Sequence, residues 1–138
     1  MKRVLFLGLL VVGSVAFVRP PSQPYRVAFD LTSRDTLEQK AVLRWLREVG
    51  GSSPEAQMEV VMYGKGFELV MPERSPYLAD VQNAMKNPNV KFKVCAIALR
   101  NNNVAASQLL PGVETVPDGI HELVMKQQDH WGYIKVMH

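Results

Sequence analysis

Residues 25–50 read YRVAFDLTSRDTLEQKAVLRWLREVG, and this stretch decides the fold class. Every second residue from Tyr25 to Leu31 is apolar, which is the period typical of a β-strand. Asp35-x-x-Glu38 and Thr36-x-x-Gln39 then both offer the side chains of a helix capping box. Apolar residues follow at helical spacing and predict an amphipathic helix that ends at the Gly50-Gly51 pair: Val42, Trp45, Leu46 and Val49.

The same alternation of strand and helix patterns continues to the end of the chain. Further strands are expected over residues 58–63, 91–97, 114–116 and 131–136. Helical segments are expected over 67–71, from Ser75-Pro76 to about 87, over 99–104 as a turn or short helix, and from Pro117-Asp118 to about 128. Short connections between alternating elements predict one α/β domain over residues 25–138, with a mainly parallel sheet covered by helices on both faces.

The first 18 residues have the composition of an export leader. Lys2 and Arg3 precede an uncharged run of 15 residues, 4–18, which is shorter than the roughly 20 apolar residues of a bilayer span. We therefore predict a signal peptide over 1–18, with an uncleaved signal anchor as the alternative because no A-x-A-like site closes the run. Residues 19–24 form a Pro-rich linker. The body is expected to be periplasmic or secreted, or held at the inner membrane by residues 4–18.

The charge distribution argues against nucleic acid as a partner. The chain has 16 basic and 13 acidic side chains, and three of the basic ones, Lys2, Arg3 and Arg19, belong to the leader and linker. The body is therefore close to neutral, and no basic stripe with interleaved aromatic residues is visible.

Cys95 is the only cysteine of the chain, so it cannot form an intramolecular disulfide. It lies near the carboxyl end of an expected strand, where open parallel sheets collect their ligands. Backbone amides of the following turn would favour the thiolate, which is the nucleophilic form. The alternative is an inert cysteine that packs as a small buried hydrophobe. The residue pattern leaves both interpretations open.

Polar and glycine residues near the ends of the first three strands are candidates for binding a substrate beside this thiol. The same residue types also serve helix capping and strand-ending turns. A basic residue after the cysteine strand would add positive charge beside a thiolate. The predicted site consists of Cys95 as the catalytic residue, with Asp30, Ser33, Gly64, Gly66 and Arg100 as substrate-binding residues.

No metal site and no cofactor are predicted. His121, His130 and His138 are too far apart along the chain to ligate from one helix, and a single thiolate is available to join them.

Several segments resemble the DsrE/DsrF-like proteins. Residues 25–33 look like the first strand of that family, and Val90-Lys-Phe-Lys-Val-Cys-Ala, leading into Arg100, is similar to its cysteine strand. Its C-terminal third is matched by Leu109-Leu-Pro-Gly-Val-Glu-Thr-Val-Pro-Asp-Gly119, Glu122-Leu-Val and Trp131-Gly-Tyr-Ile. The resemblance implies a three-layer α/β/α sandwich with a five-stranded, largely parallel sheet, assembled as a trimer or hexamer.

The resemblance also implies a role for Cys95, because better-known members carry sulfur as a persulfide on a cysteine at this strand end. A thiol-bearing protein would then be the sulfur donor or acceptor. Relatives often have Asn and a hydroxyl residue two and three positions after the cysteine, where this chain has Ile97 and Ala98. Two further functions stay open: an oligomeric module that binds a small ligand, and a scaffold subunit, each with a structural cysteine. Whether the protein is an enzyme is left undecided.

Overall fold

The computed structural model describes residues 24–137, and in this part of the chain five parallel strands form one sheet. The strand order is β4-β3-β2-β1-β5. The predicted leader, all of the linker except Pro24, and His138 lie outside the described residues. The strands are β1 (Arg26–Leu31), β2 (Gln57–Met62), β3 (Val90–Cys95), β4 (Glu114–Val116) and β5 (Gly132–Lys135).

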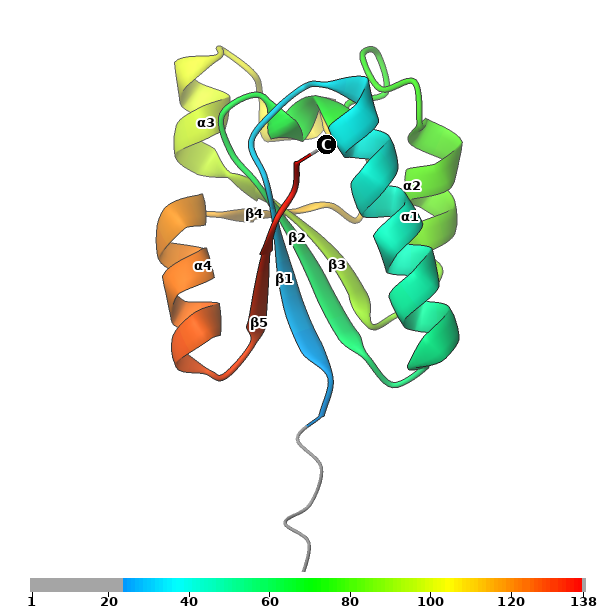
Figure 1. Ribbon diagram of the computed structural model, residues 1–138. Coiled ribbons are helices and arrows are strands. Elements are labelled where there is room, and N and C mark those ends of the chain that lie inside the picture. The colour runs from blue at the N-terminus through cyan, green and yellow to red at the C-terminus, as the bar shows by residue number, and fades with distance from the viewer. Residues whose placement is uncertain (1–23, 138) are drawn as a thin grey trace, which may run out of the picture.

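Helices cover both faces of the sheet, so the predicted three-layer α/β/α sandwich is confirmed. Figure 1 shows α1 and α2 on one side of the strands and α4 on the other, with α3 near the carboxyl ends of the strands. Two 3-10 helices, η1 and η2, lie within the connections. The bounds are α1 (Thr36–Ser52), η1 (Gly66–Val70), α2 (Leu78–Ala84), α3 (Ala96–Asn101), η2 (Ala106–Gln108) and α4 (Gly119–Gln128).

The two faces of the sheet differ in composition because successive side chains of a strand point to opposite sides. Val27, Phe29 and Leu31 of β1 belong to the main apolar core, together with the buried side of α1. The intervening residues of β1 and β2 face α4, and there the apolar cluster shrinks to Ala28, Val61 and Leu123. The α4 layer is therefore held largely by polar contacts.

A buried charge cluster joins α4 to the middle of the sheet. Lys93 Nζ lies 3.0 Å from Glu59 Oε2 and 2.7 Å from Glu122 Oε1, while Lys126 Nζ lies 2.8 Å from Glu59 Oε2. Burial raises the pKa of Glu59, although both lysines oppose the shift. Burial alone would lower the pKa of Lys93, but its hydrogen bonds to Glu122 and Glu59 outweigh that effect and raise it. Each charge in the cluster thus depends on its partners.

Three helix boundaries differ from the sequence-based prediction. Helix α1 continues through Gly50 and Gly51 to Ser52, because those glycines keep helical backbone geometry and the Ser53 amide still bonds to Val49. Helix α2 begins at residue 78 rather than at the Ser75-Pro76 pair, where the Ser75 hydroxyl instead accepts from the Tyr77 amide in a turn. Helix α3 begins directly after the cysteine strand, not at residue 99.

Among residues 24–137, no helix combines the length and the apolar composition needed to cross a bilayer.

Candidate functional site

Cys95 is the last residue of β3 and the N-cap of α3, with extended backbone angles of φ −66° and ψ 120°. Its side chain lies against the start of α4, since a Cβ built on Gly119, the first residue of α4, would lie 3.1 Å from the Cβ of Cys95. β1, β2 and β3 are adjacent in the sheet, so the loops that follow them share one rim, as the sequence predicts for neighbouring strands.

A cavity of about 240 Å³ opens beside the thiol. Cys95 is only 4% exposed and is the single free cysteine, so it forms part of the cavity wall rather than projecting into solvent. The loop after β2, helix α3 and the start of α4 supply the rest of the wall. The lining residues are Tyr63, Gly64, Cys95, Ile97, Ala98, Asn101, Asn102, Asp118 and Ile120.

Two glycines allow the chain to close around this cavity. Gly64 has φ +59°, and a Cβ there would lie 2.8 Å from the Thr32 carbonyl oxygen, so the loop after β2 packs against the end of β1. Gly119, the first residue of α4, packs against the side chains of Cys95 and Tyr63. A Cβ at Gly119 would come within 3.1 Å of the Cβ of Cys95 and 3.5 Å of that of Tyr63.

Asp118 is the only charged residue among those that line the cavity in the described chain. Its Oδ1 accepts from the backbone amides of Ile120 at 2.9 Å and His121 at 3.4 Å, which makes it the N-cap of α4. Arg100, predicted to add positive charge beside the thiol, is exposed and does not line the cavity. Ala98 and Asn101, which lie on either side of Arg100 in α3, do line it.

Asp30 lies outside the cavity but is linked to it through Tyr63. The carboxylate is 2% exposed and accepts from the Tyr133 hydroxyl at 2.6 Å and the Tyr63 hydroxyl at 3.2 Å. Lys135 Nζ donates to Asp30 Oδ1 at 3.1 Å and to Thr32 Oγ1 at 2.8 Å. The Asp30 carboxylate therefore fixes the ring of Tyr63, which forms one wall of the site.

This carboxylate also raises the pKa of both tyrosines. For Tyr133 the hydrogen bond to Asp30 is the main cause, followed by burial, and the pKa rises to about 12. For Tyr63 burial is the main cause, followed by the Asp30 charge, and the pKa also rises. Both phenols stay protonated as donors at neutral pH.

Replacing Asp30 with asparagine is expected to return the pKa of Tyr133 from about 12 toward its ordinary value of 10. The substitution removes the negative charge that opposes phenolate formation while leaving a hydrogen-bond acceptor. Ultraviolet titration of tyrosinate measures the change, and Tyr133→Phe assigns the high-pH transition among the four tyrosines. An unchanged titration curve in Asp30→Asn would contradict the linkage.

The other two predicted residues serve the loops. Ser33 Oγ accepts from the Asp35 amide at 2.9 Å, within the turn that leads to α1. Gly66 is buried against the carbonyl of Leu31 and does not line the cavity. Of the five predicted substrate-binding residues, Gly64 alone shares the cavity wall with Cys95.

Asn101 and Asn102 are cavity residues that the sequence interpretation missed. They lie six and seven residues after Cys95, about two helical turns along α3, so they come back to the side of the thiol. Asn102 Nδ2 donates to the Ala98 carbonyl at 2.7 Å. Polar amides thus enter the site one turn beyond Ile97 and Ala98, the positions where relatives often have polar side chains. Their helical spacing from the cysteine is the sequence feature that could have predicted their place in the cavity.

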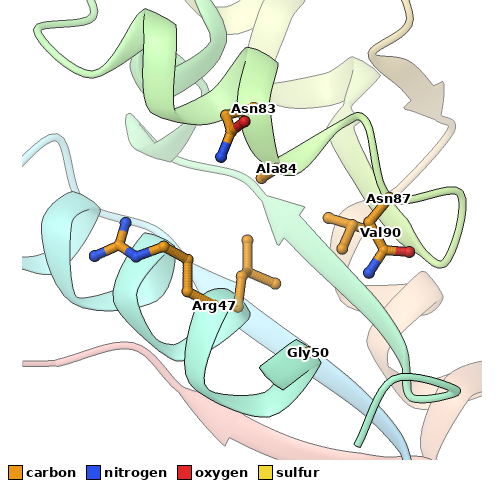
Figure 2. Close-up of a pocket in the computed structure, with 7 residues that line it drawn as sticks. Arg47, Gly50, Asn83, Ala84, Asn87 and Val90 are labelled. Atoms are coloured by element: carbon orange, nitrogen blue, oxygen red, sulfur yellow. The ribbon is translucent and has the colours of Figure 1, made fainter. Parts of the chain in front are cut away.

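A second cavity of about 240 Å³ lies between the two helices on the opposite face. Figure 2 shows Arg47 and Gly50 on α1 across from Asn83 and Ala84 on α2, with Val90 at the start of β3. None of its described lining residues carries a thiol or a carboxylate. Because it lies at the opposite end of β3 from Cys95, it does not belong to the thiol site.

Within residues 24–137, no group of three or more His, Cys, Asp or Glu side chains could hold a metal ion.

Fold and site together define a small α/β sandwich protein with one thiol at the carboxyl end of a parallel strand. Residues 28–136 match the model of the DsrE/DsrF-like family, and the chain belongs to this family. A comparison with curated proteins gave no significant match.

Solved structures agree with this assignment. A protein of unknown function from Methanobacterium thermoautotrophicum is similar with a TM-score of 0.75 and 28% identity, over 80% of this chain and 98% of that one. The ychN protein of E. coli gives a TM-score of 0.67 at 12% identity, over 82% and 99%. A conserved protein of unknown function from Bacteroides thetaiotaomicron gives 0.65 at 11%, over 80% and 94%. The last two likenesses show the fold alone.

Proposed function

We propose that the protein is a sulfur carrier that holds a sulfane sulfur atom as a persulfide on Cys95. The observation that carries this proposal is the position of the thiol, in the wall of a cavity at the carboxyl end of β3. Membership of the DsrE/DsrF-like family supports it, because the resemblance implies a sulfur-carrying cysteine at this strand end.

The transfer needs a thiolate and a donor with an S–S bond. The Cys95 thiolate attacks the terminal sulfur of a donor persulfide R–S–SH, the donor S–S bond breaks, and R–S⁻ leaves. Cys95 then carries –S–SH, and a second thiolate removes the sulfur by the reverse attack. No external oxidant or reductant is required, because one S–S bond replaces another.

Replacing Cys95 with serine is expected to abolish sulfur loading. The wild-type chain, incubated with a persulfide donor, should gain about 32 Da per sulfur atom in intact mass, and Cys95→Ser should gain none. Treatment with a reducing thiol should return the wild-type mass. Wild-type chain unfolded in denaturant is the control for donor competence: if it gains sulfur while the folded chain does not, the carrier function is contradicted.

The location and the assembly of this carrier are part of the proposal. An exported chain would meet a thiol-bearing donor or acceptor outside the cytoplasm, and the family resemblance implies a trimer or hexamer. Cell fractionation tests the first point, and light scattering at several protein concentrations tests the second.

One observation favours a different function, a ligand-binding module with a structural cysteine. Cys95 is counted among the buried residues of the main apolar core, and none of the cationic side chains within residues 24–137 lines its cavity. A thiol that resists alkylation until the chain unfolds would support this alternative.

A further inference from the structure

The charge of the Cys95 cavity restricts which donors can approach the thiol. We propose that this cavity excludes anionic sulfur compounds, such as thiosulfate, and accepts uncharged or positively charged donors, such as a protonated persulfide R–S–SH. As a statement about sulfur donors the inference rests on the proposed function, but the charge selection concerns any small reagent.

In the described part of the chain, the cavity wall carries one negative charge and no positive one. Among residues 24–137, Asp118 is the only charged residue that lines the cavity, and its carboxylate accepts hydrogen bonds from the amides of Ile120 and His121. Ile97 and Ile120, 38% and 59% exposed, add apolar surface. An anion that enters must give up water against these isoleucines and then approach a carboxylate.

The cations of this region do not offset the carboxylate. Lys65 and Arg100 are exposed and do not line the cavity. Lys93, two residues before Cys95, lies within 3.0 Å of Glu59 and Glu122, and Lys135 lies 3.1 Å from Asp30. Both of these partly exposed lysines are therefore already paired with carboxylates away from the cavity wall.

The remaining lining groups bind without a charge preference. The Tyr63 hydroxyl is committed to Asp30, while the side chains of Asn101 and Asn102 present amides. Amides donate to or accept from a neutral persulfide or its organic group, so they do not compensate for an anion's repulsion from Asp118.

Iodoacetamide and iodoacetate test the proposal, because the two reagents have nearly the same shape and differ by one negative charge. Both alkylate Cys95, and intact mass gives the two rates. Their ratio is independent of the thiolate fraction, which is common to both reactions. We expect the folded chain to prefer iodoacetamide about tenfold more strongly than the same chain unfolded in urea.

Asp118→Asn removes the charge and keeps the helix cap, since asparagine is an equally good N-cap. In this variant the preference should fall to that of the unfolded chain. Glu55→Gln is the matched control: it removes a carboxylate from an exposed position before β2, at the opposite end of the sheet, and should leave the ratio unchanged. Raising the salt concentration to about 1 M should weaken the wild-type preference.

Three outcomes would overturn the inference: equal ratios in the folded and unfolded chains, an unchanged ratio in Asp118→Asn, or a folded chain that neither reagent alkylates. The ratio of the two alkylation rates does not depend on whether Cys95 can be loaded with sulfur. A chain that selects against iodoacetate but gains no sulfur from a neutral persulfide keeps the charge selection and rejects the carrier function. A chain that gains sulfur from thiosulfate as fast as from a persulfide keeps the carrier function and rejects the charge selection.

Discussion

Gly66→Ala is expected to destabilise the folded chain by about 4 kcal/mol, because the added methyl group would overlap closely packed backbone. A Cβ at Gly66 would lie far inside the contact distance of the Leu31 carbonyl oxygen at the end of β1. The obstacle is backbone rather than a flexible side chain, and η1 is buried directly behind it. The loop after β2 would have to move away from β1, and with it the Gly64 wall of the cavity.

Urea unfolding measures this loss, with Gly51→Ala as the matched control. Gly51 lies in α1, and a Cβ built there would meet no atom within 4 Å apart from its own helix backbone and its two chain neighbours. Alanine at this position should therefore stabilise the helix by about 0.5–1 kcal/mol. A small effect of Gly66→Ala, similar in size to that of Gly51→Ala, would show that the loop is not packed against Leu31.

Lys93→Met is expected to destabilise the chain by about 3 kcal/mol at neutral pH. Lys93 pairs with Glu59 and Glu122, and the side chain of Glu59 is only 2% exposed. Methionine fills a similar volume but leaves Glu59 with Lys126 as its remaining cation. Glu59 would keep one of its two cationic partners, and the desolvation free energy of its buried carboxylate would then be only partly offset.

The loss should depend on pH in a defined direction. The pKa of Glu59 in the folded chain is raised above its ordinary value of 4.5. The free energy of unfolding therefore falls as the pH rises from that ordinary value to the raised one. Without Lys93 the pKa rises further. The destabilisation by Lys93→Met should therefore be smallest near the ordinary Glu pKa of 4.5 and grow as the pH rises toward neutral, as urea unfolding at several pH values would show.

Lys91→Met is the matched control on the same strand. Lys91 and Glu114 form a pair at 3.7 Å with about half of each side chain exposed, and such pairs contribute less than about 1 kcal/mol. We expect a change below about 0.5 kcal/mol with little pH dependence. Equal losses in the two variants, or a pH-independent loss in Lys93→Met, would contradict the buried cluster.

The fold was predictable because the local patterns agree with the global arrangement. The strand at Arg26–Leu31 and the Asp35 cap of α1 lie where the apolar period and the capping residues predict them. Helix boundaries were less predictable. The low helix propensity of glycine predicts that the helix ends at Gly50-Gly51. α1 nevertheless extends to Ser52, because its packed earlier turns are already formed and each further residue adds a backbone hydrogen bond.

The candidate site was predictable only in part. The position of Cys95 at a strand end follows from the period-two pattern of residues 90–95. Its place near a cavity follows from the tendency of parallel sheets to bind ligands at the carboxyl ends of their strands. Asp118 and Ile120 lie at the start of α4, more than twenty residues after Cys95 in the chain, and join the cavity because α4 contacts β3. The residues around Cys95 in the sequence do not indicate that Asp118 and Ile120 lie near it.

The sequence by itself determined that this chain forms an alternating α/β domain with one thiol at a strand end, because hydrophobic period and capping chemistry act over a few residues. Only the tertiary structure decided what surrounds that thiol. It placed Arg100 outside the cavity, brought Asn102 and Asp118 into it, and joined Asp30 to it through Tyr63. The physical reason is that charge and access at a site depend on side chains that distant segments bring within a few ångströms of each other.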